Sequence, residues 1–420
     1  MSATRDRTLW MLAVGAMLLS GCGKQSGDKN LSRTISLWHF WSEPKQEAAL
    51  KTIVAEYERT HPGTSVQLTA LSWNEGKTKL LAAFNSGTVP DVVELGSDWV
   101  AQFSSSGVLT DLSSGFSTDT TIFTSSTLAP GLWNGTLFAV PWVVDTRVMF
   151  YNKELMARAG LDSSAPPATW ADLQMACDKI TSLGGGVFGF GANASDAHRL
   201  YKKVLPFIWA NGGDVLSADG KQCVINSDQN KIALNAYLRL TSTGMLETQK
   251  QLDAEFSQGV IGFWFSGGWL IDKISAEHPD LHYGITLMPQ PAAGTGSRAS
   301  FAGGEYLAVP RGAKEQTAVL DLVHYLTDGP NALAFCKQVT EAGYPADRRY
   351  QNDAFFANDP HRKMFIAQLA SARFTPVHPK WLDIEKIVED EVVEAMYGRK
   401  TADQALDEAR VEIEEILTRR

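Results

Sequence analysis

Residues 140–155 read VPWVVDTRVMFYNKEL, and this stretch decides how the rest of the chain is organised. The run is apolar except at Asp145 and Arg147, and residues 148–151 are typical of a strand that is buried on both faces. An unpaired charge in such a strand is costly. Two interpretations remain open. The charges form an ion pair at the end of an ordinary strand, or the strand crosses between two lobes and passes a polar cleft.

Strand and helix patterns alternate on both sides of this stretch. Ser42 is expected to cap the first helix, with Pro44 in its first turn. Thr401 and Gln404 are expected to form a capping box at the start of the last helix. Repeated strand–helix units predict an α/β fold with largely parallel sheets. Strands are expected at 35–40, 66–71, 92–95, 187–190, 260–265 and 301–309.

Length and composition narrow the class of protein. A chain of 420 residues is long enough for two to three domains. Its 44% hydrophobic and 20% charged residues are typical of a globular body. The net charge of −9 is spread along the chain, and no basic stripe is visible, which argues against a nucleic acid as a partner.

The first residues have the pattern of an export signal. Arg5 and Arg7 precede an apolar run at residues 9–19 that is too short to span a bilayer. The sequence Leu19-Ser20-Gly21-Cys22 then resembles a bacterial lipobox, in which the cysteine becomes the lipid anchor. We therefore expect a signal peptide at residues 1–21, lipidation of Cys22, and a flexible polar tether at residues 22–33. The anchor is expected to hold the exported protein at the cell envelope.

No metal or cofactor chemistry is expected. Cys177, Cys223 and Cys336 fit no metal motif and are interpreted as core residues, with one disulfide left open. Residues 189–194 match the loose glycine pattern of dinucleotide sites, but an exported protein meets little nicotinamide cofactor, and we predict that no cofactor is bound.

The candidate binding residues are aromatic, acidic and amide side chains near the ends of the predicted strands. In open parallel sheets, ligands bind beyond the carboxyl ends of the strands. A sugar needs flat rings for its C–H face and planar polar groups for its hydroxyls. Any single tryptophan is also a candidate core residue, and Trp73 and Trp381 are weaker site candidates. The predicted site comprises Trp41, Glu43, Glu94, Asp98, Trp142, Asp145, Asn211, Asp214, Trp264, Trp269, Gly304, Glu305 and Arg348.

Six stretches together resemble the extracellular solute-binding proteins of ATP-driven importers, the family that includes maltose-binding protein. They are the lipobox, residues 140–155, Trp38-His39-Phe40-Trp41, Val89-Pro90-Asp91-Val92-Val93, GFWFSGGWLID at 262–272 and FAGGEYLAVP at 301–310. The resemblance implies the type II periplasmic-binding-protein fold, with two α/β lobes joined by crossing strands. The expected lobes are residues 34–144 plus about 303–345, and residues 145–302 plus about 346–420.

The resemblance also implies function and partners. A protein of this kind is a monomer that captures a sugar between its lobes and delivers it to the transmembrane permease of an ABC importer. It is not an enzyme.

Two rival functions share the same composition. The carboxylates could instead bind a polyamine, with tryptophans adding cation–π contacts. They could also be the acid and base of a secreted glycosidase, whose two carboxyl groups lie about 5 to 10 Å apart.

Overall fold

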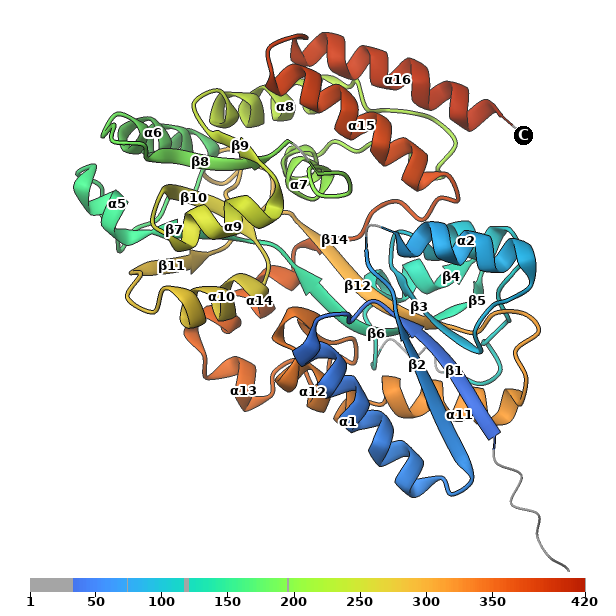
Figure 1. Ribbon diagram of the computed structural model, residues 1–420. Coiled ribbons are helices and arrows are strands. Elements are labelled where there is room, and N and C mark those ends of the chain that lie inside the picture. Colours follow the sequence, from blue (N-terminus) through green and yellow to red (C-terminus); the bar gives the residue numbers. More distant parts are fainter. Residues whose placement is uncertain (1–32, 74, 117–120, 195, 420) are drawn as a thin grey trace, which may run out of the picture.

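The computed structural model describes residues 33–73, 75–116, 121–194 and 196–419. The expected signal peptide and Cys22 lie outside these described residues. The described part contains two large β-sheets, each with helices packed around it (Figure 1).

The first sheet has the strand order β13-β6-β12-β3-β1-β2, and β14 pairs with β12 beside this path. β1 is parallel to β2 and β3, as strand–helix units predict, whereas β12 is antiparallel to both β3 and β6. The sheet is therefore mixed. Its strands are β1 (Arg33–His39), β2 (Thr64–Ala70), β3 (Val92–Gly96), β6 (Ala139–Thr146), β12 (Ser300–Ala308), β13 (Tyr344–Pro345) and β14 (Ala372–Arg373).

The second sheet has the order β11-β7-β10-β8-β9. β8 is parallel to β9 and β10, and β7 is antiparallel to β10 and β11. Its strands are β7 (Val148–Asn152), β8 (Phe188–Asn193), β9 (Met245–Glu247), β10 (Ile261–Ser266) and β11 (Tyr283–Thr286). A separate two-stranded sheet joins β4 (Leu132–Trp133) to β5 (Thr136–Leu137).

The chain passes from one sheet to the other at Arg147. β6 ends one residue earlier in the first sheet, and β7, whose five residues are all buried, begins one residue later in the second. The return strand β12 lies against this crossing, because Thr146 Oγ1 donates a hydrogen bond to Phe301 O at 2.7 Å and Ser300 Oγ donates to Arg147 O at 2.6 Å. Arg147 also pairs with Asp145. The ion pair and the crossing between the two sheets are therefore both present, whereas the polar cleft stays a prediction.

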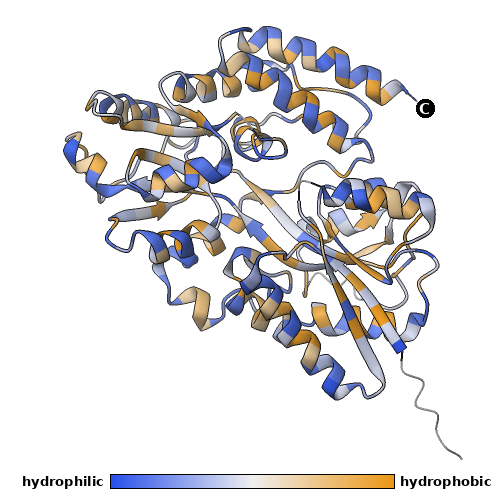
Figure 2. Ribbon diagram, viewed as in Figure 1, coloured by the Kyte–Doolittle hydropathy of each residue, from blue (hydrophilic) through white to orange (hydrophobic). Residues whose placement is uncertain are grey.

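Helices pack around both sheets, and hydrophilic and hydrophobic residues alternate along their ribbons (Figure 2). In α1, all five predicted apolar-face residues are buried, namely Ala49, Leu50, Ile53, Val54 and Tyr57. The helices are α1 (Pro44–Thr60), α2 (Gly76–Ser86), α3 (Val100–Ser105), α4 (Ser125–Leu128), α5 (Lys153–Arg158), α6 (Trp170–Thr181), α7 (Tyr201–Ala210), α8 (Asp228–Thr241), α9 (Gln249–Ser257), α10 (Trp269–Glu277), α11 (Gln316–Thr327), α12 (Gly329–Gln338), α13 (Ala354–Ala357), α14 (Pro360–Leu369), α15 (Trp381–Met396) and α16 (Ala402–Thr418).

One of the two predicted caps is confirmed and the other is shifted. Gln404 N donates to Thr401 Oγ1 at 3.2 Å, and Thr401 N donates to Gln404 Oε1 at 2.9 Å, which is the predicted capping box of α16. In α1 the prediction of Ser42 was wrong by one residue. Glu43 is the N-cap, and its backbone N–H donates to Gln46 Oε1 at 3.2 Å.

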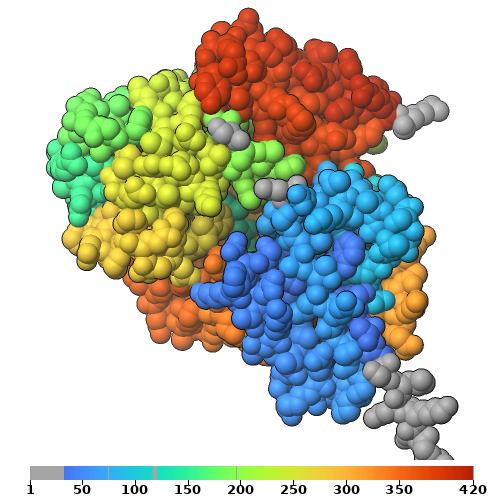
Figure 3. Space-filling model, viewed as in Figure 1, coloured from blue at the N-terminus to red at the C-terminus, as the bar shows by residue number. Residues whose placement is uncertain are grey.

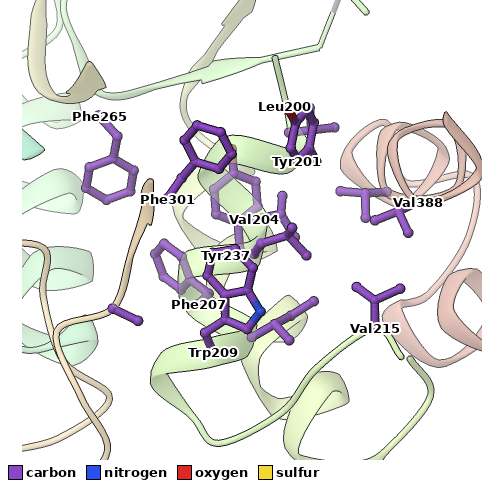
Figure 4. Packing of buried hydrophobic residues seen from close by; sticks show 14 of the residues in the cluster. Leu200, Tyr201, Val204, Phe207, Trp209, Val215, Tyr237, Phe265, Phe301 and Val388 are labelled. Atoms are coloured by element: carbon purple, nitrogen blue, oxygen red, sulfur yellow. The ribbon is translucent and has the colours of Figure 1, made fainter. Parts of the chain in front are cut away.

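The three described cysteines are free and buried, which confirms their interpretation as core residues; among the described residues, none is in a disulfide. Cys177 also explains Gly189, the first glycine of the pattern at 189–194. A Cβ added to Gly189 would lie 2.2 Å from Cys177 O, so this glycine lets α6 pack closely on β8. The core beside it centres on α7, where Val204, Phe207 and Trp209 lie among side chains from neighbouring elements (Figure 4).

Candidate functional site

The candidate site is built on the first sheet, where β1 and β3 end. In the sheet register, Glu305 of β12 lies opposite Gly96 of β3, and Leu307 lies opposite Glu94. Side chains two residues apart on a strand point to the same face, so Glu94 and Glu305 lie on one face of the sheet. Trp41 follows the end of the neighbouring parallel strand β1. Strand pairing therefore brings together predicted site residues that are far apart in sequence.

Four buried polar atoms of this region have no hydrogen-bond partner among the described residues. They are Nε1 of Trp41, Nε1 of Trp142, Oε1 of Glu94 and Oε2 of Glu305. The two indole rings are in edge contact, with centroids 6.2 Å apart. Buried polar groups in native proteins nearly always have partners. Two donors and two acceptors in this part of the first sheet therefore mark a place suited to a polar ligand, and all four belong to predicted site residues.

The ring faces of the two tryptophans are used by the protein itself. Trp142 stacks on Phe335 with centroids 4.8 Å apart, and Trp41 packs edge-on against the same ring at 5.2 Å. Both indoles are buried. These residues thus present indole N–H groups to the site and no open face for stacking.

Trp41, Trp142, Glu94 and Glu305 are called the wall of the candidate site below. Burial keeps its two carboxyl groups, those of Glu94 and Glu305, protonated to unusually high pH. Burial raises the pKa of Glu94 to about 8, against the opposing hydrogen bond that its Oε2 accepts from Phe40 N at 3.0 Å. The pKa of Glu305 is raised well above its ordinary value, first by burial and then by the nearby charge of Glu94. Near neutral pH, the pair can therefore donate as well as accept hydrogen bonds.

Trp73 supplies the open aromatic surface that Trp41 and Trp142 do not. Its side chain is 36% exposed, and its ring stacks on Phe40 with centroids 4.3 Å apart. A Cβ added to Gly96 would lie 2.8 Å from Asp98 Oδ1, 3.6 Å from the Trp73 ring and 3.9 Å from Glu305 Oε2. One ring and two carboxyl groups thus surround a single point, and the glycine keeps that point open. Trp73 was only a weak candidate in the sequence.

The crossing between the two sheets at residues 145–147, called the hinge from here on, contributes a buried cation. Arg147 pairs with Asp145, and its guanidinium carbon lies 4.7 Å from the centroid of the Trp269 ring and 5.4 Å from that of Phe301. Its Nε has no hydrogen-bond partner among the described residues. The Trp269 ring, predicted to stack on a ligand, is therefore covered by a protein side chain on one face.

Asp253 of α9 joins Trp264, Ser266 and Trp269 through hydrogen bonds, and it was not among the residues predicted from the sequence. Its carboxylate is buried and accepts hydrogen bonds from Trp264 Nε1 at 2.8 Å, Trp269 Nε1 at 2.9 Å and Ser266 Oγ at 2.9 Å. Trp264 is completely buried, so it lies in the core and not on an open face. No local motif marks Asp253, because its partners come from the following strand and helix.

The structure gives Glu43 and Gly304 local structural roles. Glu43 is exposed and caps α1. A Cβ on Gly304 would lie 2.4 Å from Val143 O, so the glycine permits close pairing of β12 with β6 beside the register shift at Glu305.

Two further predicted residues are held in side-chain contacts with the protein, and a third is exposed. Asn211 ends α7, and its Nδ2 donates to Gln229 O at 2.8 Å. Asp214 forms an ion pair with Arg373 at 2.7 Å. Arg348 was expected to bind a ligand or pair with Asp347. The structure corrects this pairing, because Arg349 pairs with Asp347 at 2.6 Å, while Arg348 is exposed.

The start of α7 brings two further groups to the predicted site. Tyr201 Oη donates to Asp98 Oδ2 at 3.0 Å, and Lys202 Nζ lies 5.1 Å from the centroid of the Phe301 ring. Burial lowers the pKa of Lys202, whereas the negative charge of Asp98 opposes that shift. The sequence carried one signal for these groups, since a tyrosine and two lysines open an otherwise apolar helix.

The described residues form neither a metal-binding cluster nor a membrane-spanning helix. They contain no group of three or more His, Cys, Asp or Glu side chains arranged to hold a metal ion. No described helix is long and apolar enough to cross a membrane.

Comparison with known proteins places this geometry in context. The model of a family described as bacterial extracellular solute-binding protein matches residues 41–330. A maltooligosaccharide ABC transporter solute-binding lipoprotein of Streptococcus pneumoniae is 24% identical over 96% of this chain and 95% of its own length. A galactooligosaccharide-binding protein of Bacillus subtilis is 22% identical over 97% of this chain and 96% of its own.

The solved structures confirm the predicted fold. An ABC transporter solute-binding protein of Thermotoga lettingae, bound to α-D-tagatose, superposes with a TM-score of 0.81 at 22% identity, covering 92% of this chain and all of that one. The chain therefore has the two-lobed α/β fold that its sequence predicted. In the space-filling view, a recess separates the blue N-terminal segments from the green and yellow middle of the chain (Figure 3).

Proposed function

This chain belongs to the family of bacterial extracellular solute-binding proteins, and we propose that it binds a sugar or oligosaccharide between its two lobes for an ABC importer. The relatives named above for maltooligosaccharides and galactooligosaccharides support a carbohydrate ligand. The family consists of binding proteins, and the proposed role involves capture and release without chemical change.

The proposal depends on the cluster of buried polar atoms that find no hydrogen-bond partner in the described part of the chain. A sugar hydroxyl both donates and accepts hydrogen bonds, so it matches a wall that combines the indole N–H groups of Trp41 and Trp142 with the carboxyl oxygens of Glu94 and Glu305. The open ring of Trp73 beside Glu305 suits the apolar C–H face of a pyranose.

A polyamine is the weaker ligand on electrostatic grounds. The Arg147 guanidinium and the Lys202 ammonium both lie beside Phe301, and they would repel a polycation held near them. The raised pKa of Glu94, about 8, also reduces the negative charge of the wall near neutral pH. A neutral polyol avoids both costs.

The remaining features follow from this role. The proposed lobes are residues 34–144 plus about 303–345, and residues 145–302 plus about 346–420, with Asp145 and Arg147 at the hinge. The signal peptide and the lipid on Cys22 would hold the monomer at the cell envelope beside the permease. Replacing Cys22 with alanine should release the protein from the membrane fraction, and equal palmitate incorporation by both forms would contradict the anchor.

Calorimetry tests the ligand class directly. The purified protein is titrated with maltose, maltotriose, galactobiose and spermidine, and a micromolar sugar complex, about −8 kcal/mol, is expected. The sugar should be recovered intact after long incubation. Binding of spermidine alone would favour the cation importer, and steady hydrolysis of the sugar would favour a glycosidase.

A further inference from the structure

A hydrogen bond joins the two halves of the molecule beside the candidate site. Tyr201 Oη donates to Asp98 Oδ2 at 3.0 Å. Asp98 follows β3 in the first sheet, whereas Tyr201 begins α7, which lies between β8 and β9 of the second sheet in sequence. The bond therefore spans the boundary between the two sheets and not the interior of either.

The second half of the chain holds Tyr201 rigidly. Its backbone N–H donates to Glu389 Oε1 of α15 at 3.2 Å, and its ring lies edge-on to Phe301 at 5.7 Å and to Trp381 at 6.3 Å. Figure 4 shows the Tyr201 ring beside Phe301 and Val204. A phenol anchored in this way has little rotamer freedom left to lose when it meets Asp98.

The turn before α7 is fixed from the same helix. His198 has a φ of 60°, a left-handed conformation that few non-glycine residues adopt. Its backbone N–H donates to the other oxygen of Glu389 at 2.9 Å, and its ring pairs with the fully buried Glu385. The carboxylates of α15 thus stabilise the one conformation that points Tyr201 at Asp98.

The two carboxylate oxygens of Asp98 have different surroundings. Asp98 Oδ2 accepts the bond from Tyr201, while Asp98 Oδ1 faces the point above Gly96 that the Trp73 ring and Glu305 also border. Burial and the negative charge of Asp98 raise the pKa of the Tyr201 phenol well above its ordinary value, so it stays a donor throughout the physiological range.

We infer that Tyr201 is a positioning residue that holds the lobes together through Asp98 Oδ2 and thereby orients Asp98 Oδ1 toward the ligand. The hydrogen bond between Tyr201 and Asp98 does not depend on any ligand, because both partners are side chains of the protein. The orientation of a ligand group by Oδ1 rests on the proposed function. The carboxylate of Asp98 would then take part both in ligand binding, through Oδ1, and in lobe closure, through Oδ2.

The bond is tested first without ligand, by distance measurements between spin labels. Labels are attached at Asn85→Cys on α2 and Asn235→Cys on α8, both exposed, while the three described native cysteines are buried. Tyr201→Phe should increase the population at long distances. Tyr237→Phe is the matched control, because the buried Tyr237 hydroxyl has no partner among the described residues. Identical distance distributions for Tyr201→Phe and the wild type would overturn the inference.

The ligand arm uses maltotriose. Tyr201→Phe should weaken binding about 10-fold or more, because a hydrogen bond to a charged group is lost, and most of the change should be a faster dissociation rate. Tyr237→Phe should bind as the wild type does. A variant that loses thermal stability but keeps the wild-type dissociation rate would show a purely structural role and refute the positioning role. If the wild-type protein binds no sugar, the proposed function fails, and the spin-label result still decides whether the bond closes the lobes.

Discussion

The Arg147 guanidinium carbon lies 4.7 Å from the centroid of the Trp269 indole, so a hinge cation covers the ring that the sequence suggested as a stacking floor. The indole N–H of Trp269 is also engaged, because it donates to Asp253 Oδ2 at 2.9 Å. The ring is thereby committed to protein contacts. The open ring of the candidate site belongs to Trp73, which precedes the hinge in the sequence, whereas Trp269 follows it.

Truncation of Trp73 should weaken sugar binding far more than it destabilises the protein. Trp73→Ala removes the open ring next to Glu305 and should reduce affinity by about 10- to 100-fold, a typical hot-spot loss. Tyr397→Ala, at an aromatic side chain that is 47% exposed, serves as the control and should bind normally. Calorimetry measures both affinities, and unchanged binding by Trp73→Ala would move the stacking surface elsewhere.

Trp269→Ala should act mainly on stability. It removes the ring under Arg147 and leaves Asp253 Oδ2 without its indole partner, so the free energy of unfolding should fall by about 3 kcal/mol. Trp269→Phe keeps a ring and should lose about 1 kcal/mol. Urea denaturation checks both values. A large loss of affinity at unchanged stability would restore Trp269 as the stacking floor.

Asp145→Asn should destabilise the hinge whatever the ligand is. Asp145 is the ion-pair partner of Arg147, whose side chain is only 5% exposed, and loss of its charge leaves a buried cation uncompensated, at a cost of about 3 kcal/mol. The double variant Asp145→Asn/Arg147→Met should recover part of that loss. Denaturation of Glu47→Gln, which breaks the exposed pair with Lys51, is the control and should match the wild type.

Because Asp145 is paired with Arg147, its substitution is a poor test of whether the ligand is a sugar or a cation. A substitution at Asp145 changes the hinge itself, so Glu305→Gln is the cleaner test. It should weaken sugar binding little, because an amide, like a protonated carboxyl group, both donates and accepts hydrogen bonds. It should weaken spermidine binding strongly, because a bound polyammonium would favour the ionised form of Glu305, which glutamine cannot adopt. Parallel titrations of the two ligands measure the difference, and equal losses would mean that Glu305 does not separate them.

Glu94 should make the protein less stable as the pH rises. Burial raises the pKa of Glu94 from 4.5 to about 8 in the folded protein. Between these two pH values the folded state holds a proton that the unfolded chain has released, so the free energy of unfolding falls as the pH increases through this range. Glu94→Gln removes the titrating group, and its unfolding free energy should depend less on pH there.

The comparison must be made as a difference between variants, because His39 acts in the opposite direction. Burial lowers the pKa of His39 from 6.5 to about 4, so stability is lost as the pH falls through that interval. Both proteins share this effect, and it cancels in the difference. Glu412→Gln, at an exposed glutamate, is the matched control. Parallel curves for Glu94→Gln and the wild type would contradict a protonated Glu94.

The sequence was sufficient for the fold because its signals are local. The apolar run of β7 and the capping box of α16 each depend on residues within a few positions of one another. The interruption at Asp145 and Arg147 identified the crossing between sheets, since only a special position tolerates two charges in such a strand.

The sequence was not sufficient to distinguish open rings from packed ones. Trp142 is covered by Phe335, which lies almost two hundred residues further along the chain, and no local pattern reveals that contact. The sequence also did not show which of two adjacent arginines, Arg348 or Arg349, pairs with Asp347. Arg349, and not Arg348, reaches the buried Asp347, because the backbone direction of the loop decides which of the two side chains lies beside it. Antiparallel pairing of β12 with β3 nevertheless brought Glu94 and Glu305 to one face of the sheet, although both lie within their strands and not at the ends.

The exposure of Trp73 has an optical consequence. It is 36% exposed, whereas every other tryptophan of the described residues is buried or partly buried. Indole fluorescence shifts to shorter wavelength when water is removed from the ring, so a molecule that covers Trp73 would change the emission of one fluorophore against a constant background from the others. Because the Trp73 ring lies beside Gly96 and near Glu305, its fluorescence would report occupation of the candidate site without any attached label.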